Sequence, residues 1–418
     1  MRVPCAVFGV YLCAQSVIVW GQTPMPLAKL QAEALAQNPS LAAARQRWRA
    51  AQAAIAPAGA LPDPHAEVQQ MNGGSPVPLA GYGDNMMSYV GVGAMQALPY
   101  PGKLKLRAAV AASNASALQQ SWRQAQRQLR EQVADAYIAL QQARAVRGVL
   151  VRQQQVLAEA EKLAEVHYRT ARGPQADVLA AQLEQTKMLR NLVRNQDLRQ
   201  AAQARLRALV NRAPSAAAIT PEPLRPTRLQ APEAQVVAAL ARGDPALAVQ
   251  RARLTSAQQA TALARKNFQP DFTAQFMWEH TAAAFPDRTM ITLGMSLPFF
   301  HRHSRQEPEL ERAAALHAAA QADLQQLQLR DRDRLTEALL AVQSDGQILA
   351  IDQQGALPQA RASAQAALTA YANGQGDLNS YLTAWREALA LEQQYWQTLG
   401  AHEAALATVT ALTGVEHD

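Results

Sequence analysis

A short histidine-rich segment is the part of the sequence whose residue types and spacing most resemble a metal site. His301 and His303 flank one residue, and Glu307 follows four positions later. Imidazole and carboxylate groups bind zinc, but a histidine pair without further spaced ligands is only a weak indication. The segment also lies where a predicted strand leads into a helix, a place at which polar residues are expected. Because no phosphate-binding loop, nucleophile elbow or supported carboxylate pair occurs elsewhere, we expect no metal, no cofactor and no catalytic residue.

Both cysteines lie in a stretch that resembles an export signal. Arg2 gives it a positive start, a mostly apolar run follows, and small residues near Gly21 suit a signal peptidase, so we predict a signal peptide at 1–21. Lipid attachment at Cys13 is an alternative, although bulky Leu12 stands where such sites prefer a small residue. The cleaved chain has no thiol, and hence no disulfide or thiol nucleophile. Since no later apolar run is long enough for a transmembrane helix, the exported protein is either soluble in the periplasm or inserted as β-structure.

The composition indicates long helices rather than compact globular domains. The chain has 418 residues, is rich in Ala, Gln, Leu and Arg, and contains only 5% aromatic residues, a mixture typical of coiled coils. Its net charge is +7, with basic and acidic residues interspersed. Nucleic-acid-binding proteins gather Lys and Arg into one patch, so we expect no nucleic-acid partner.

The sequence contains one structural unit twice. Asn38-Pro39 and Asp244-Pro245 each open a helix, with Asn or Asp as the N-cap and Pro as the first helical residue. In both copies a proline then ends this helix, two strands follow, and a Leu-Pro corner leads into a much longer helix. The predicted units are a first repeat at 22–212, a proline-rich linker at 213–232 and a second repeat at 233–418.

Each copy contains a very long helix and a shorter returning helix. The long helices are predicted at 103–167 and 304–371, and Pro358 should kink or break the second one. At 1.5 Å per residue, about 65 helical residues span roughly 100 Å, far more than a compact domain requires. The turns at 168–175 and 371–377 lead into the returning helices. In each copy the two shorter helices, stacked end to end, match the long one, as in a tube of constant height.

Of four predicted strands, the two in the second copy show the alternating polarity of membrane strands clearly, and the two in the first copy show it more weakly. The four strands are predicted at about 63–71, 87–97, 271–279 and 289–297. On the third strand Phe272, Phe276 and Trp278 share one face, while Thr273 and Gln275 lie on the other. A tilted strand of this length can span a bilayer, and aromatic residues at its ends suit the membrane interface. The residues expected in such an aromatic girdle are Tyr100, Trp278, Phe299 and Phe300.

The number of strands has a consequence for assembly. Half-buried strands of soluble proteins alternate too, so two hairpins beneath a helical bundle are an alternative. Strands that cross a membrane must instead form a closed barrel, because an open edge leaves backbone groups without partners in lipid. Four strands are too few for this, since small barrels have about eight. Membrane-spanning strands therefore imply that several chains share one barrel, and three chains would supply twelve strands.

These features resemble the TolC-type outer-membrane efflux proteins over the whole predicted mature chain. The duplicated order of helix, strand, strand, long helix, turn and helix is the most specific part of the resemblance. Local motifs add to it, namely Leu-Pro-Asp-Pro at 61–64, Pro-Tyr-Pro-Gly-Lys at 99–103 and Asp-Val-Leu at 177–179. The first two motifs are most similar to the heavy-metal branch, the CzcC and CusC relatives.

The resemblance implies a mainly α fold with a small β part, assembled as a homotrimer. Twelve strands would form a barrel in the outer membrane of a Gram-negative bacterium, in contact with its lipid, and the helices a tunnel in the periplasm. Such a duct passively releases heavy-metal ions or small toxic compounds, and docks onto a periplasmic adaptor and, through it, an inner-membrane RND-type pump. The outer-membrane component of type I protein secretion and a soluble periplasmic coiled-coil adaptor are alternative functions.

The resemblance also implies functional residues at the two helical turns. In the family, an aspartate after each turn narrows the closed periplasmic entrance. Asp177 matches it in the first copy, whereas the second copy has Ser380 there and Asp377 nearby. A ring of Asp177 carboxylates would attract cations, but a carboxylate in a first helical turn also stabilises the helix dipole, and both roles are compatible with the sequence. The predicted gate residues are Tyr168, Arg172, Asp177, Tyr371, Asp377 and Ser380, and the predicted adaptor contacts are Gly173, Pro174, Gly374 and Gly376.

Overall fold

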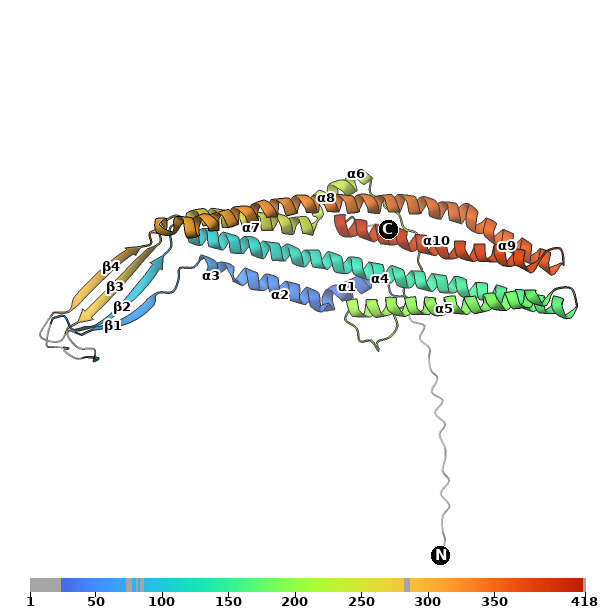
Figure 1. Ribbon diagram of the computed structural model, residues 1–418, viewed down its shortest axis with the longest axis horizontal. Helices are drawn as coiled ribbons and strands as arrows, with labels where there is room; N and C mark the ends of the chain where they lie inside the picture. The colour runs from blue at the N-terminus through green and yellow to red at the C-terminus, as the bar shows by residue number, and fades with distance from the viewer. Residues whose placement is uncertain (1–23, 73–76, 80–81, 83–85, 282–285, 416–418) are drawn as a thin grey trace, which may run out of the picture.

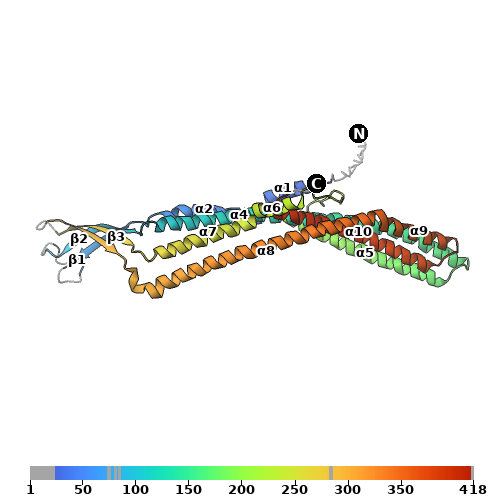
Figure 2. The ribbon, with the colours of Figure 1, turned by 90° about the horizontal axis from the view of Figure 1, so that it is seen from above.

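The chain is elongated, with a small sheet at one end and two helical turns at the other (Figure 1). The computed structural model describes residues 24–72, 77–79, 82, 86–281 and 286–415, and the predicted signal peptide lies outside them. Helices run side by side between the two ends (Figure 2). The fold is therefore mainly helical with one four-stranded sheet, as the sequence predicts.

Both copies of the unit follow the same order of elements. The first copy consists of α1 (Leu27–Gln37), α2 (Pro39–Ala53), α3 (Ile55–Gly59), β1 (His65–Met71), β2 (Tyr89–Leu98), α4 (Lys103–Arg169) and α5 (Gln175–Leu209). The second consists of α6 (Glu233–Gly243), α7 (Pro245–Lys266), β3 (Phe272–His280), β4 (Arg288–Met295), η1 (Pro298–His301), η2 (Arg302–Gln306), α8 (Glu307–Ile351), η3 (Asp352–Ala356), α9 (Leu357–Ala372) and α10 (Leu378–Thr413). The short helices α1 and α6, which precede the Asn-Pro and Asp-Pro pairs, were not predicted.

Proline and its neighbours set several helix boundaries. Asn38 Oδ1 accepts a hydrogen bond from the Ser40 N–H at 2.9 Å, and Asp244 Oδ1 accepts one from the Ala246 N–H at 2.8 Å, which confirms both predicted N-caps. The π-helical turn η3 ends immediately before the helix that contains Pro358, so the predicted break is present there. A second π-helical turn, η2, delays the start of α8 to Glu307, because Pro308 lacks the N–H of a regular helix.

The sheet has the order β1-β2-β3-β4, with every neighbouring pair antiparallel. β1 begins at His65 rather than at the predicted residue 63, because Pro62 and Pro64 cannot donate to a ladder. One face is apolar and exposed, and Ile291 and Leu293 on it are 74% and 79% exposed. The other face is largely polar. β1 and β4 form the two edges, so the outer side of each has no strand partner among the described residues.

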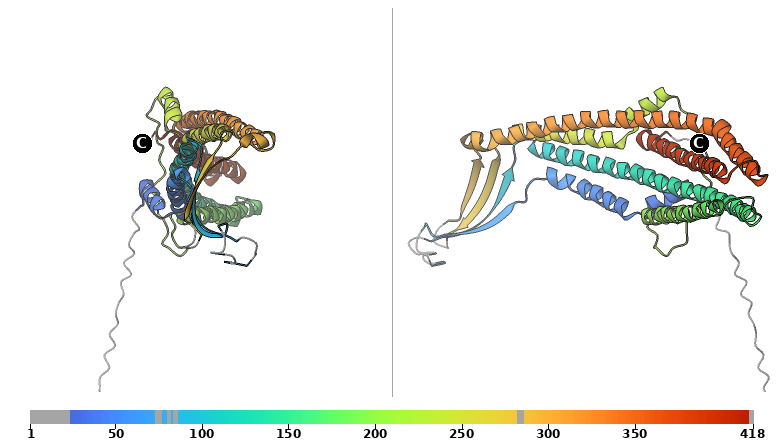
Figure 3. Two further views of the ribbon diagram at one scale, coloured as in Figure 1. Left: turned by 90° about the vertical axis from the view of Figure 1, so that its left-hand side faces the viewer. Right: turned by 45° about the vertical axis from the view of Figure 1, so that its right-hand side comes forward.

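The helices form a bowed layer in which α4 is central (Figure 3). α4 packs against α2 and α5 of its own copy and against α7 and α10 of the second copy, and α8 packs on the far side of α7 and α10. This leaves one side of α5 and one side of α8 without a neighbouring helix in the described part of the chain. Large apolar side chains are exposed on both helices, including Leu189 and Val193 on α5 and Leu329 and Leu340 on α8. Among the helices described, none is both long and apolar enough to cross a membrane.

Candidate functional site

The two helical turns have the same backbone geometry. In the first, the Ala171 N–H donates to the Tyr168 carbonyl and the Arg172 N–H to the His167 carbonyl. In the second, the Gly374 N–H donates to the Tyr371 carbonyl and the Gln375 N–H to the Ala370 carbonyl, which is the same pattern. Ala171 and Gly374 both have positive φ, 55° and 70°. The two turns are therefore equivalent residue by residue, with Asp177 at the position of Ser380.

The second turn packs against the first through Tyr371. This side chain is only 3% exposed, and its hydroxyl donates to Asp177 Oδ2 at 3.2 Å. Its ring lies 4.9 Å from the ring of His167, centroid to centroid. Tyr168, the equivalent residue of the first turn, is instead exposed. The structure thus brings Asp177 and Tyr371 together, and joins the two hairpins asymmetrically.

The Tyr371 hydroxyl is fixed as a hydrogen-bond donor. Burial raises its pKa well above the ordinary value for tyrosine, and the neighbouring Asp177 carboxylate raises it further. The hydroxyl therefore keeps its proton at any physiological pH. The contact with Asp177 consequently does not respond to pH through the tyrosine.

The other predicted residues of the second turn have a local role. Asp377 caps α10, with Oδ1 accepting from the Ser380 N–H at 2.9 Å and Oδ2 from the Ser380 hydroxyl at 2.7 Å. The hydrogen bond from the Ser380 hydroxyl is the main reason that the pKa of Asp377 lies below its usual range. Pro174 takes the N-cap position in the first turn. Asp377 and Ser380 therefore contact each other.

The predicted adaptor contacts lie on exposed turns with little room for larger side chains. A Cβ atom on Gly173 would approach the His167 Cβ to 3.2 Å, and one on Gly376 would approach the Ala370 Cβ to the same distance. Gly374 has a positive φ, which favours glycine, although Ala171 has the same kind of conformation in the first turn. Arg172 projects from the first turn and is exposed.

Two buried glutamates above the turns were not predicted as functional residues. Glu184 on α5 is 4% exposed, and accepts hydrogen bonds from Lys187 at 2.7 Å and from Arg386 of α10 at 3.0 Å. Burial raises its pKa, but these two cations outweigh burial and the net pKa lies below the usual range. Glu392 on α10 similarly accepts from Arg361 at 2.6 Å. Both glutamates occupy apolar stripes of their helices. A charged residue within such a stripe is the feature of the sequence that could have identified them.

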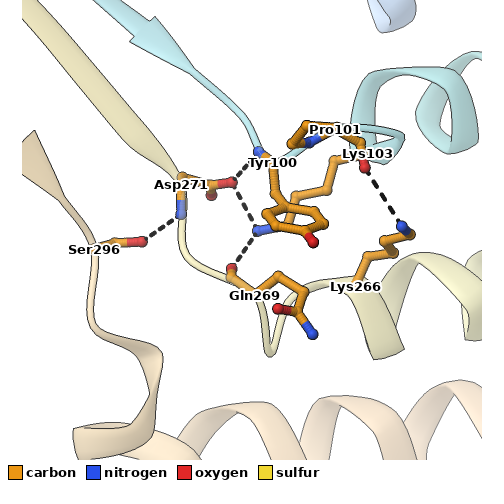
Figure 4. Close-up of polar contacts among 7 residues, drawn as sticks. All are labelled: Tyr100, Pro101, Lys103, Lys266, Gln269, Asp271 and Ser296. Atoms are coloured by element: carbon orange, nitrogen blue, oxygen red, sulfur yellow. Dashed lines mark hydrogen bonds and ion pairs between the residues drawn. The ribbon is translucent and has the colours of Figure 1, made fainter.

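At the opposite end of the helices, a buried lysine fixes the corner between sheet and helix (Figure 4). Lys103 is 2% exposed, and its Nζ donates to Asp271 Oδ1 at 2.8 Å and to the Gln269 carbonyl at 3.1 Å. Asp271 Oδ1 also accepts from the Tyr100 N–H at 2.7 Å. Burial raises the pKa of Asp271, but the hydrogen bond from Lys103 outweighs it, so the net pKa is lowered. The Pro-Tyr-Pro-Gly-Lys motif thus joins the two copies.

The predicted aromatic girdle divides between the two ends of the sheet. Tyr100, Phe299 and Phe300 lie at the helical end, with the Lys266 ammonium 5.2 Å from the centre of the Tyr100 ring. Phe299 and Phe300 are 61% and 71% exposed. Trp278 lies toward the other end of β3 and stacks on His280 at 5.8 Å. Two aromatic levels are thus separated by an apolar sheet face, and their position at the membrane interfaces stays a prediction.

The histidine pair at the second corner does not gather metal ligands. His303 Nδ1 lies 2.6 Å from Glu307 Oε2, and this hydrogen bond is the main reason that the pKa of Glu307 is lowered. Within the described part of the chain, no three His, Cys, Asp or Glu side chains lie close enough together to hold a metal ion.

Comparison with known families accounts for both repeats. A family model described as outer membrane efflux protein matches residues 30–212 and 236–415. The chain belongs to the outer membrane efflux protein family. Members of this family are trimeric channels of the outer membrane that reach into the periplasm and work with adaptor and pump proteins. This efflux protein is accordingly an outer-membrane transport duct and not an enzyme.

Solved structures share the fold of this efflux protein at low sequence identity. The outer-membrane channel OprN is 18% identical, with a TM-score of 0.82 over 93% of this chain and 90% of that chain. VceC from Vibrio cholerae is 20% identical, with a TM-score of 0.79 over 93% and 96%. CusC is 16% identical, with a TM-score of 0.77 over 92% and 91%. A comparison with curated protein sequences gives no match.

Proposed function

We propose that three copies of this chain form the passive exit duct of a tripartite efflux system. The turns between α4 and α5 and between α9 and α10 would contact a periplasmic adaptor, which connects the duct to an RND-type pump in the inner membrane. The observation that carries this proposal is the pair of unpaired sheet edges, β1 and β4, at opposite sides of one chain. Such edges are costly in lipid unless another chain pairs with them.

The helices support the same assembly. The helix α5 lies on the same side of the chain as β1, and α8 lies on the same side as β4 (Figure 1). Both helices have large exposed apolar side chains. Large exposed apolar patches usually mark interaction sites. A ring of copies would cover the α5 side of one chain with the α8 side of the next.

Heavy-metal ions are the substrate class that we propose. The support comes from the two corner motifs, Leu-Pro-Asp-Pro at 61–64 and Pro-Tyr-Pro-Gly-Lys at 99–103. In the second motif, Lys103 donates a hydrogen bond to Asp271 of the second copy. These motifs resemble the heavy-metal branch of the family. Small toxic compounds are the second candidate, since the family is described only as outer membrane efflux protein and this description does not restrict the substrate to metal ions.

Loss of this protein should make its host more sensitive to metal ions. We expect zinc, cobalt or copper salts to inhibit the growth of a deletion strain at severalfold lower concentrations than those that inhibit the wild type. A plasmid copy of the gene should restore the wild-type tolerance. Growth inhibition by the three metals and by a panel of dyes and antibiotics is the measurement. Sensitivity to drugs alone would favour small toxic compounds, and loss of a secreted protein without either effect would favour type I secretion.

Asp177 and Tyr371 are proposed to hold the periplasmic entrance narrow. Their hydrogen bond, at 3.2 Å, ties the first hairpin to the second in each chain. Three Asp177 carboxylates around the axis of a trimer would also favour cations. The Asp177 carboxylate would therefore both restrain the hairpins and select cations.

Replacement of Asp177 should therefore change conduction. In trimers reconstituted into planar bilayers, we expect Asp177→Ala to raise conductance and to lower the preference for cations, because a restraint and a charge are removed together. Ser380→Ala is the matched control at the equivalent position, and it should leave conductance unchanged since Asp377 still caps α10. Unchanged conductance and ion preference in Asp177→Ala would remove the proposed role.

A further inference from the structure

The two strand-to-helix corners correspond residue by residue, and this correspondence predicts a contact between chains. Leu-Pro-Tyr-Pro-Gly-Lys at 98–103 aligns with Leu-Pro-Phe-Phe-His-Arg at 297–302, so Lys103 corresponds to Arg302. Leu-Pro-Asp-Pro at 61–64 aligns with Gln-Pro-Asp-Phe at 269–272, so Asp63 corresponds to Asp271. Each corner therefore has one cation at the start of a long helix and one carboxylate before a strand.

At the first corner, the cation and carboxylate come from the two strands that pair in the middle of the sheet. β2 leads to Lys103, Asp271 leads into β3, and β2 pairs with β3. The Asp271 carboxylate accepts from the Lys103 ammonium and from the Tyr100 N–H (Figure 4). The segment Gln269 to Asp271 thus fills the space beside the helix start. This contact joins the chain segments next to the paired strands β2 and β3. We call such a junction between two repeats a seam, and this one the β2–β3 seam.

At the second corner, the corresponding space is open. A groove of about 300 Å³ is lined by Pro270, Leu297, Phe299 and Arg302, among others. The Arg302 side chain is 59% exposed. Asp63, before β1, is exposed, and no described residue forms a hydrogen bond or ion pair with it. β4 and β1 are the unpaired edges of the sheet, so each half of the second contact is present without its partner.

We propose that Arg302 of one copy binds Asp63 of the next copy and closes the seam between chains. The segment Leu61 to Asp63 of the second copy would lie in the groove, as Gln269 to Asp271 lies beside Lys103. The occupant is a second copy of this chain because β1 and β4 are the sheet edges that need a partner. This inference rests on the proposed trimer, and adds the residues that set the register of its seam.

Arginine suits this position better than lysine would. Arg302 Nε donates to Glu307 Oε1 at 3.0 Å, and the guanidinium lies 5.7 Å from the centre of the Phe268 ring. A guanidinium has five N–H donors in a planar fork, so its outer edge can bind a second carboxylate while Nε keeps Glu307. The first corner has Ala108 at the position of Glu307. The cation of that corner, Lys103, therefore binds only one carboxylate among the described residues, that of Asp271.

A charge exchange tests the contact directly. We expect Asp63→Arg alone and Arg302→Asp alone to lower the temperature at which purified trimers dissociate in detergent. The double variant, in which the charges are exchanged, should recover most of this loss. Arg312→Asp is the matched control, because this exposed arginine on α8 pairs with Glu309 of its own helix and lies away from the groove.

Cross-linking gives a second readout that does not depend on stability. Because the predicted mature chain has no cysteine, Asp63→Cys combined with Arg302→Cys should form covalent dimers and trimers with a short bis-maleimide, and neither single variant should. Intact trimers with neither cross-linking nor recovery in the double exchange would overturn the contact while leaving the trimer in place. A wild-type protein of monomeric mass in detergent would instead overturn the proposed assembly, and the contact with it.

Discussion

Asp271→Ala is expected to be strongly destabilising, because it leaves the Lys103 ammonium buried without its carboxylate. The Lys103 side chain is 3% exposed, and after the change only the Gln269 carbonyl would accept from it. Removing one partner of a buried ion pair costs about 3 kcal/mol or more. Urea unfolding of the purified full-length protein should therefore show a markedly lower midpoint.

The opposite change should cost less, which separates the ion pair from general damage at the corner. Asp271 is 43% exposed, so in Lys103→Met its carboxylate can be hydrated and still accept from the Tyr100 N–H. The double variant should lose less than the sum of the two single losses. Lys266→Met is the control, since this half-buried lysine contacts the Pro101 carbonyl at 3.4 Å and the Tyr100 ring but forms no ion pair with a described carboxylate. Equal losses in Asp271→Ala and Lys266→Met would contradict the explanation.

A buried pair of carboxyl groups near the middle of the helices predicts the second large effect. Asp244 and Asp331 are 8% and 3% exposed, and one oxygen of each has no hydrogen-bond donor. Burial, more than the adjacent Asp331, raises the pKa of Asp244 to about 6. Asn38, the equivalent residue of the first copy, has an amide that donates to the Leu209 carbonyl at 2.9 Å. Asp244 can donate in this manner only when it is protonated.

Folding should therefore be more favourable in mild acid as far as Asp244 is concerned. Its pKa is higher in the folded chain than the usual 3.8, so its stabilising contribution is complete below that value and is lost as the pH rises through about 6. The difference is on the order of 2 to 3 kcal/mol, since one pKa unit corresponds to about 1.4 kcal/mol. Arg127 on α4 lowers the pKa of Asp244, but by less than burial raises it, and Arg330 on α8 donates to Asp331 Oδ1 at 3.3 Å.

Asp244→Asn should remove this dependence on pH. The new amide can cap α7 and donate toward Asp331 at any pH, so we expect stabilisation at about pH 8 and little change at about pH 4. Thermal unfolding across that range is the measurement, and the infrared band of a protonated carboxylic acid, lost in the variant, is a second one. Asp345→Asn, at a less buried carboxyl on α8, serves as the control. An unchanged pH profile in Asp244→Asn would show that the protonation of Asp244 does not contribute to the pH dependence of stability.

The helices and strands with a regular pattern, and the helix boundaries set by proline, could be predicted from the sequence. Proline at 39, 245 and 358 acts on its own helix, so the two helix starts and the break in the second long helix followed from local rules. The short helices α1 and α6 could not be recognised in this way, because burial of residues such as Leu30 and Val236 against distant helices stabilises them. Local pattern predicts elements whose stability is local.

The same distinction applies to the candidate site, where the residues could be predicted but their contacts could not. Asp177 and Tyr371 were both predicted, but their contact and the exposure of Tyr168 depend on how two hairpins pack, which no spacing in the sequence specifies. Lys103 and Asp271 stood in recognisable motifs, yet they lie 168 residues apart and meet only because β2 pairs with β3. Residue types were thus available from the sequence, and partners came from the topology.

The covalent link between the two copies has a consequence for how a ring of chains would form. Every β2–β3 seam is built while a single chain folds, because the segment between α5 and α6 tethers the two repeats. Only β4–β1 seams would require collisions between separate molecules, so half of the junctions around the ring carry no concentration dependence. Gene duplication would in this way have halved the number of encounters per closed ring. It also leaves each junction type free to evolve its own chemistry, lysine within the chain and arginine at its edge.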